Sequence, residues 1–251
     1  MLIQVVSDLH LEQRTEIPSI IPRTDTLFLA GDIGVLGDPL YEAFIKYCNH
    51  GWSTVFYVLG NHELYSKTKS MKQLVEEYKD FVGKFDNIVL LDHSKCQYAG
   101  YQIIGCTFWG DFSKRTPVSG SPHKILVEEG GGLVPIGCDR ITKMNIASQG
   151  WVVDNLHPVL PTIVLTHFPL MLINDKVRQV SYRDEDPTVL YEYGTDMKLA
   201  SVNGLVCISG HTHYSHDFSK NGVRYISNQL GYPAEQNDNL CEYKTCVFSI
   251  G

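Results

Sequence analysis

The chain has 251 residues, of which 43% are apolar and 20% are charged, and this composition excludes a disordered chain. Its 21 basic and 28 acidic residues leave a formal net charge of −7. Non-specific binding to nucleic-acid phosphates needs a basic surface, so the acidic balance argues against extended nucleic acid as a partner. An anionic substrate would have to be attracted locally, by a metal, a helix end or an arginine cluster.

Cysteine usage and the apolar segments predict a cytoplasmic protein without a membrane partner. The seven cysteines are an odd number in a chain too long to depend on disulfides, which favours a reducing compartment. The first residues lack the basic region and long apolar run of a signal peptide. The longest charge-free stretch, residues 155–174, contains three prolines and two histidines, so a buried strand is expected there rather than a membrane helix.

Short apolar runs alternate with helical patterns along the whole chain, which predicts an α/β fold. Strands are expected at residues 2–6, 27–30, 54–59, 88–91, 101–108, 162–165, 205–208, 223–226 and 245–250. Helices are expected at 39–51 after an Asp38 N-cap, at 70–82 with Gly83 as the stop, and at 139–156. No linker separates the two halves, so residues 1–251 are expected to form a single domain.

Two regions show no clear pattern of secondary structure, residues 110–137 and 168–194. Loops of this length in a compact domain usually carry a function, and we expect these two to shape a substrate site. Tyr182, Tyr191 and Tyr193 lie in the second region, where they either line a pocket or anchor the loop.

Five of the predicted strands end in a cluster of polar side chains. The clusters are Asp8-Leu9-His10, Gly31-Asp32, Gly60-Asn61-His62-Glu63, His167 and Gly210-His211-Thr212-His213. Each motif alone is common: a Gly-Asp after a strand is usually a turn, and a single strand-end histidine usually bonds to backbone. All of them together, each after a strand, are hard to attribute to chance, and the carboxyl edge of an α/β sheet is where ligands bind.

The side chains in these clusters supply oxygen and nitrogen ligands and no thiolate. Such sets suit manganese, iron, zinc, nickel or cobalt. They are numerous enough to hold two ions that share one carboxylate, and two neighbouring ions can activate water and neutralise phosphoryl oxygens. Hydrolysis of a phosphate ester is the reaction that most needs this arrangement.

The ordered set of motifs resembles the calcineurin-like metallophosphoesterase superfamily, over residues 8 to 213. The resemblance implies a four-layer sandwich of two mixed sheets flanked by helices, with a dinuclear metal site at the strand ends. It implies that Asp8, His10, Asp32 and His213 hold one ion, and that Asp32, Asn61, His167 and His211 hold the second. Manganese is the first expectation for the two divalent or trivalent ions.

The same resemblance implies the course of the reaction. A hydroxide that bridges the ions would attack phosphorus, with Asp32 as the shared ligand. Asn61 and His62 would contact the phosphate, and His62 would act as general acid towards the leaving oxygen. Many family members carry a carboxylate that orients this histidine three residues after the bridging aspartate, where this chain has Val35. Asp38, a water or a backbone carbonyl are the candidates to replace it.

Candidate substrate contacts beyond the metal site are fewer. Arg178 and Arg183 could bind a phosphate, although the neighbouring acidic run 184–186 would pair with them instead. Arg14 is a weaker candidate of the same kind. Trp109 could stack on a base, but an aromatic residue beside a strand more often belongs to the core.

The sequence therefore predicts a metal-dependent phosphoesterase acting on a small, nucleotide-like phosphomonoester or phosphodiester. Two alternatives stay open: a catalytically inactive protein-binding scaffold of the same fold, and a phosphoprotein phosphatase. Intact ligand positions argue against the scaffold. The missing carboxylate, and the absence of the arginine that usually follows it, argue against the phosphatase. The oligomeric state is not predicted.

Overall fold

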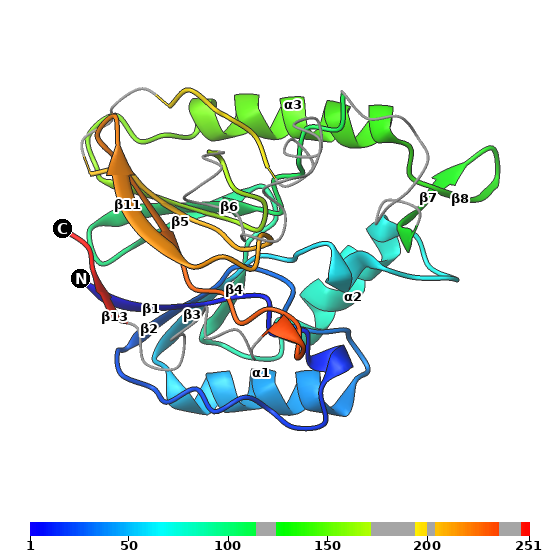
Figure 1. Ribbon diagram of the computed structural model, residues 1–251, viewed down its shortest axis with the longest axis horizontal. Coiled ribbons are helices and arrows are strands. Elements are labelled where there is room, and N and C mark those ends of the chain that lie inside the picture. The colour runs from blue at the N-terminus through cyan, green and yellow to red at the C-terminus, as the bar shows by residue number, and fades with distance from the viewer. Residues whose placement is uncertain (114–123, 172–193, 200–203, 236–246) are drawn as a thin grey trace.

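The computed structural model describes residues 1–113, 124–171, 194–199, 204–235 and 247–251, and it contains two large mixed sheets (Figure 1). The first sheet has the strand order β13-β1-β2-β3-β4. Its strands are β1 (Leu2–Val6), β2 (Thr26–Leu29), β3 (Thr54–Tyr57), β4 (Ile88–Leu90) and β13 (Val247–Ser249). Strands β1 to β4 are parallel, and β13 pairs antiparallel with β1.

The second sheet has the strand order β11-β12-β10-β9-β6-β5. Its strands are β5 (Ser94–Tyr98), β6 (Tyr101–Cys106), β9 (Thr162–Thr166), β10 (Val206–Ile208), β11 (His216–Lys220) and β12 (Val223–Ser227). The four central strands are parallel and the two edge strands are antiparallel to their neighbours.

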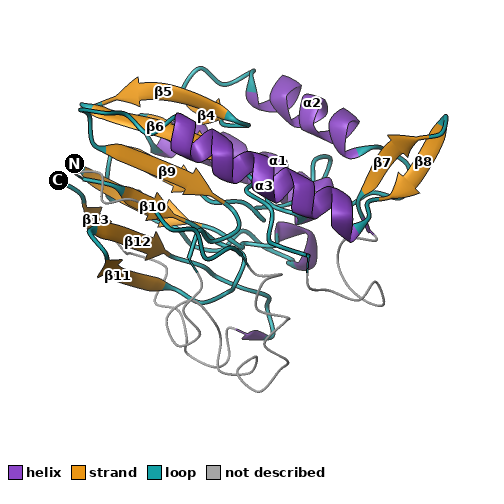
Figure 2. Ribbon diagram, turned by 90° about the horizontal axis from the view of Figure 1, so that it is seen from above, coloured by secondary structure: helices purple, strands orange, loops and turns teal. Residues whose placement is uncertain are grey.

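The sheets are stacked between helices, as Figures 1 and 2 show. Helices α1 (Pro39–Gly51) and α2 (Met71–Val82) cover the outer face of the first sheet, and α3 (Cys138–Asp154) covers the outer face of the second. Three apolar cores separate these layers, one under α1 and α2, one between the sheets and one under α3. The predicted four-layer α/β sandwich is therefore confirmed.

The central strands are buried on both faces, which explains why they read as continuous apolar runs. In β2, Leu27 and Leu29 pack in the core under α1, while Phe28 packs between the sheets. In β9, Val164 packs under α3, while Leu165 packs between the sheets. Each strand thus contributes to two cores through the period of two of its side chains.

The structure corrects the expectation of a loop throughout residues 110–137. Strands β7 (Leu126–Glu129) and β8 (Gly132–Pro135) form an antiparallel hairpin within it. Its two-residue turn places Gly130 at φ 61° and Gly131 at φ 82°, a left-handed conformation that glycine adopts without strain. Residues 114–123 of the first region and 172–193 of the second, including Tyr182, Tyr191 and Tyr193, lie outside the described residues.

The predicted helices are present with ends that differ by at most two residues, and side chains cap the N-termini of α1 and α2. Asp38 precedes α1, and its carboxylate accepts a hydrogen bond of 2.8 Å from the Leu40 amide. Ser70 and Gln73 form a reciprocal capping box at the start of α2. Among the described helices, none is both long and apolar enough to cross a membrane. Five of the seven cysteines lie in the described residues, all as free thiols.

We expect Asp38→Ala to lower the free energy of unfolding by about 1 kcal/mol, because the Leu40 amide in the first turn of α1 would lose its side-chain acceptor. Urea denaturation followed by circular dichroism measures the change. Asp86→Ala is the control, since Asp86 is exposed and lies outside the helices, and it should alter stability by less than about 0.5 kcal/mol. Equal effects of the two substitutions would contradict a capping role for Asp38.

Candidate metal centre

The polar clusters of both sheets meet at one edge of the sandwich. Asp8, Asp32 and Asn61 follow β1, β2 and β3, which are parallel neighbours in the first sheet. His167 and His211 follow β9 and β10, which are parallel neighbours in the second sheet. Parallel strands bring their carboxyl ends to the same side, so the two sheets deliver these side chains to a common place.

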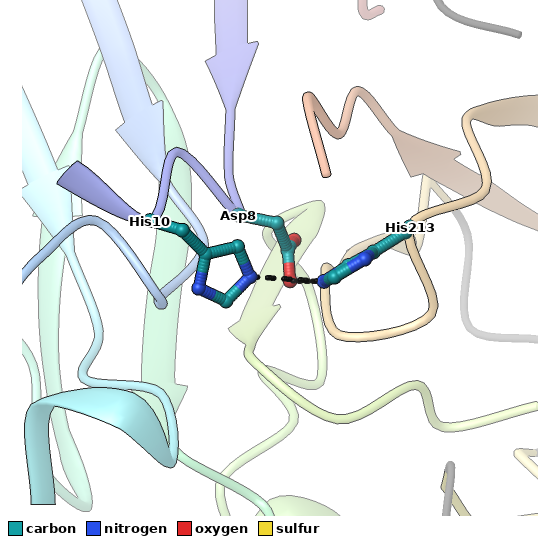
Figure 3. A group of neighbouring side chains, drawn as sticks. All are labelled: Asp8, His10 and His213. Atoms are coloured by element: carbon teal, nitrogen blue, oxygen red, sulfur yellow. Dashed lines mark hydrogen bonds and ion pairs between the residues drawn. The ribbon is translucent and has the colours of Figure 1, made fainter. Parts of the chain in front are cut away.

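The first group consists of Asp8 and His10, from the loop after β1, and His213, from the loop after β10 (Figure 3). The Nε2 atoms of His10 and His213 lie 2.9 Å apart. Asp8 Oδ1 lies 3.5 Å from His213 Nε2, and Asp32 Oδ2 lies 3.9 Å from His10 Nε2. Asp8 and His10 have no exposed surface, and His213 is 7% exposed.

The second group consists of Asp32, Asn61, His167 and His211. His167 Nε2 lies 3.0 Å from Asn61 Oδ1, 3.2 Å from His211 Nδ1 and 3.5 Å from Asp32 Oδ1. Asp32 therefore stands between the two groups, with Oδ1 towards the second and Oδ2 towards the first.

Hydrogen bonds on the far side of the rings fix which nitrogens of the first group carry protons. His10 Nδ1 lies 3.3 Å from Glu12 Oε1, and His213 Nδ1 lies 2.6 Å from Glu235 Oε2. An ionised carboxylate only accepts hydrogen bonds, so in both rings Nδ1 donates and Nε2 presents a lone pair in the neutral ring. Two lone pairs 2.9 Å apart repel each other unless a cation or a proton lies between them.

In the second group, too, hydrogen bonds to the surroundings determine which atoms present lone pairs. His167 Nδ1 donates to the Ala30 carbonyl at 2.8 Å, which leaves the lone pair of Nε2 directed at the group. The Asn61 amide nitrogen donates to the Tyr65 hydroxyl at 2.6 Å, so the Asn61 oxygen faces His167 Nε2 as a second acceptor. Acceptors that face one another in both groups are the donor chemistry of cation ligands, so these residues fit two metal ions.

The electrostatics of the site favour positive charge. Burial opposes charging of His213, but its hydrogen bond to Asp8 and that to Glu235 together raise the pKa of His213 to about 10. Burial also opposes ionisation of Asp32, yet the charges of His167 and His62 hold the pKa of Asp32 well below its usual range. Burial, with the charge of His167, lowers the pKa of His211 to about 3, so its lone pair is available.

His62 lies beside both groups and is partly exposed. Its Nε2 lies 4.0 Å from Asp32 Oδ2 and 3.1 Å from the Tyr232 hydroxyl. Its Nδ1 lies 2.9 Å from Glu12 Oε1. The charge of Asp32 and the contact with Glu12 outweigh burial and raise the pKa of His62.

The contact with Glu12 corrects the expectation for the orienting group. Neither Asp38, a water nor a carbonyl is needed, because Glu12 contacts His62 directly while the Asp38 carboxylate caps α1. Glu12 sits on a single turn of 3-10 helix (η1, Leu11–Gln13), two residues beyond His10. Burial raises the pKa of Glu12, but hydrogen bonds to His10 and His62 lower it to about 2 overall.

The other residues predicted as substrate contacts either lie outside the described residues or make contacts within the protein. Arg178 and Arg183 lie outside the described residues. Arg14 donates from Nε to the Leu9 carbonyl and from Nη2 to the Gly231 carbonyl, each at 2.5 Å, so it ties together the loops that carry His10 and Glu235. Trp109 is 4% exposed and belongs to the core under α1 and α2, as an aromatic residue beside a strand usually does.

Sequence reasoning missed several residues that support the site. Glu12, Tyr65, Tyr232 and Glu235 contact the predicted ligands or His62, as described above. The ring of Tyr232 lies 4.3 Å from that of His10 and 4.5 Å from that of His213, centroid to centroid. The spacing Asp8-x-His10-x-Glu12 was a usable signal for Glu12, but Tyr232 and Glu235 follow β12 without any recognisable pattern.

The family model for calcineurin-like phosphoesterases matches residues 1–215. The chain belongs to this family. It is a metal-dependent hydrolase of phosphoric esters. The match covers every strand-end cluster described above, so the family assignment and the geometry concern the same residues.

Two individual proteins are similar over nearly the whole chain. Uncharacterized protein L509 of Acanthamoeba polyphaga mimivirus is 28% identical over 264 residues, covering 94% of this chain and 93% of the relative. The crystal structure of phosphopantetheinyl hydrolase (PptH) from Mycobacterium tuberculosis matches with a TM-score of 0.70 and 19% identity. That match covers 96% of this chain and 93% of the other, and at this identity it shows the fold alone.

We expect Gly60→Ala to prevent normal metal loading. A Cβ at this position would lie 2.2 Å from Asp32 Oδ1 and 2.5 Å from the Asp32 amide nitrogen, so Asp32 would have to move. Metal bound after incubation with Mn²⁺ and desalting, measured by mass spectrometry, should fall by more than half. Gly150→Ala is the control, because a Cβ there meets open space within α3. Equal metal content in the two variants would contradict this reading of Gly60.

Proposed function

We propose that the chain hydrolyses a small phosphomonoester or phosphodiester, such as a nucleotide-like compound, at a dinuclear centre. The observation that carries the proposal is the arrangement of two ligand groups whose acceptor atoms face one another and which share Asp32. In the second group both His167 Nε2 and Asn61 Oδ1 are acceptors, and their facing lone pairs cost electrostatic energy that a bound cation would remove.

The ligands divide between two ions according to their contacts. Asp8, His10 and His213 would hold the first ion, together with Asp32 Oδ2. Asn61, His167 and His211 would hold the second ion, together with Asp32 Oδ1. Manganese is the proposed metal, since the mixed imidazole, carboxylate and amide set suits it; iron, zinc, nickel and cobalt fit the same donors.

Two cations bound there would neutralise the phosphoryl oxygens and lower the pKa of water so that it can attack phosphorus. The chain itself contributes orientation and proton transfer. Asn61 and His62 lie at the border of the ligand groups, where they would contact the phosphate. His62 Nε2 would donate its proton to the leaving oxygen, while Glu12 accepts from Nδ1 and keeps the ring in the productive tautomer.

Four finer points stay proposals. The geometry at the metal centre suits monoesters and diesters alike, so both classes are included. A phosphate contact by Arg178 or Arg183 remains as predicted from the sequence. A cytoplasmic location and a single domain remain as predicted from the cysteine usage and from the continuous pattern of elements.

Turnover should depend on metal and on Asp32. The protein loaded with Mn²⁺ should hydrolyse 4-nitrophenyl phosphate or bis(4-nitrophenyl) phosphate, lose this activity in EDTA and regain it on addition of Mn²⁺. Asp32→Asn should lower kcat/KM by more than about 100-fold, because one ligand to both ions is weakened. Release of nitrophenolate measures the rates. Absence of turnover of any phosphoester with any divalent metal would favour the scaffold alternative.

Glu12 and His62 should act together in proton transfer to the leaving group, so that replacing either one gives the same kind of kinetic defect. His62→Ala should lower kcat by about 100-fold or more for alkyl phosphates, and far less for nitrophenyl esters, whose leaving group needs no proton. Glu12→Ala should show the same dependence on leaving group with a loss of about 10- to 100-fold, and should add little to His62→Ala.

The design includes a control and a second readout. Gln13→Ala changes an exposed neighbour of Glu12 and should leave kcat within about twofold of the original enzyme. Metal content is measured for every variant, because Glu12 also contacts His10. Fully multiplied losses in the double variant, or equal losses for both classes of leaving group, would show that Glu12 does not act through His62.

A further inference from the structure

A cavity of about 610 Å³ opens beside the metal centre, and it is lined by Tyr65, Ser66, Lys67, Lys124 and Leu126. We propose that this cavity binds a second anionic group, carried by the leaving alcohol of the substrate. The preferred substrate would then be a phosphoester with a further phosphate or carboxylate on its alcohol part. This inference rests on the proposed function, since it places the leaving group of that reaction.

Tyr65 connects the cavity to the reaction site. Its hydroxyl accepts a hydrogen bond of 2.6 Å from the amide of Asn61, and its ring lies 4.6 Å from that of His62. The same ring forms part of the cavity wall. A leaving alcohol that receives a proton from His62 therefore extends along Tyr65, and the part of the substrate beyond the ester oxygen reaches the cavity.

Two lysines give the cavity its charge. The ammonium of Lys124 lies over the face of the Tyr65 ring, 5.0 Å from its centroid, so a cation–π contact holds it beside the residue that links the cavity to Asn61 and His62. The Lys124 carbonyl accepts a hydrogen bond of 2.9 Å from the Ser66 amide, which fixes the two walls of the cavity to each other. Lys67 follows directly after Ser66 and is exposed.

The charges of these lysines are not neutralised within the described part of the chain, where neither Lys67 nor Lys124 has a carboxylate within 4 Å. Other lysines of the same region are paired: Lys69 contacts Glu77 at 2.7 Å, and Lys79 contacts both Glu76 and Asp92. In a chain with a net charge of −7, two ammonium groups without a carboxylate partner among the described residues create a local attraction for anions beside the proposed phosphate site.

The apolar residues of the cavity wall indicate the kind of carbon skeleton that would join the two anionic groups of the substrate. Tyr65 and Leu126 present apolar surface between the metal centre and the ammonium groups. A short carbon skeleton, such as a sugar or an aryl ring, would pack on them while its second anion meets the lysines. The observations thus favour a bifunctional organic phosphate over a simple alkyl phosphate.

Kinetics with three matched esters test the proposal. These are 4-methylphenyl phosphate, 4-(carboxymethyl)phenyl phosphate and 4-(phosphonomethyl)phenyl phosphate, which share one scissile bond and differ in the second anion. Lys124→Met should raise KM for the two anionic esters by about three- to tenfold, as loss of a charge-assisted contact predicts, with kcat within about twofold. KM for the methyl ester should not change. The relative effects on the two anionic esters distinguish a carboxylate from a phosphate ligand.

The controls separate charge from packing. Lys124→Arg should restore the KM of the original enzyme, because arginine keeps both the charge and the contact with the ring. Lys84→Met removes an ammonium that lies 5.5 Å from the Phe81 ring, away from the site, and should leave all three esters unaffected. Equal changes of KM for the neutral and anionic esters, or no change for any of them, would overturn the proposal.

A binding experiment without turnover keeps this inference distinct from the proposed function. Benzylphosphonate is the probe, added to the purified protein without removal of metal, and reductive methylation followed by mass spectrometry reports the reactivity of each lysine. Labelling of Lys67 and Lys124 should slow by at least about twofold, while labelling of Lys84 should not change. Protection without turnover of any ester would remove the proposed function and keep the anion site; turnover without protection would remove the anion site alone.

Discussion

The carboxylate of Glu63 holds the centre of the site together. It has no exposed surface, and it accepts hydrogen bonds from the amides of Asp32, Ile33 and Gly60 and from the Tyr57 hydroxyl, at 2.7–3.0 Å. Burial, with the charge of Asp32, raises the pKa of Glu63 to about 8, while the bonds from Ile33 and Tyr57 favour the ionised form. One buried group thus joins the loop after β2 to the loop after β3 and sets the position of Asp32, which stands between the two groups.

Much of this fold and site can be predicted from the sequence, because strands buried on both faces and ligands at their ends leave strong local patterns. The strands β1, β2, β3, β9 and β10 and the Asp38 cap of α1 are predictable in this way. The edge strands β5 and β11 were not, since half-exposed polar residues carry little apolar periodicity. The hairpin β7–β8 was missed although its Gly130-Gly131 pair is a hairpin signal between two short apolar runs.

The residues around the ligands were harder to predict, because their roles depend on contacts between distant parts of the chain. Glu12 and His62 are 50 residues apart, and only the fold shows that the carboxylate reaches the imidazole. Glu235 reaches His213 in the same way from the loop after β12. Val35 stands where many family members have an orienting carboxylate, but His62 still has such a partner, because Glu12 contacts its ring from a different turn of the chain.

The backbone is strained at five residues of the loops that form the candidate metal centre. Asp8, His10, Asp32, His211 and His213 all have left-handed φ angles between 47° and 72°, and each such residue costs about 1 kcal/mol or more. The fold sustains this strain, and cations bound at these residues would offset it by their attraction to the same side chains. We therefore expect starvation for metal to loosen these loops first, and the abundance of the protein in a cell to follow its metal supply through proteolysis.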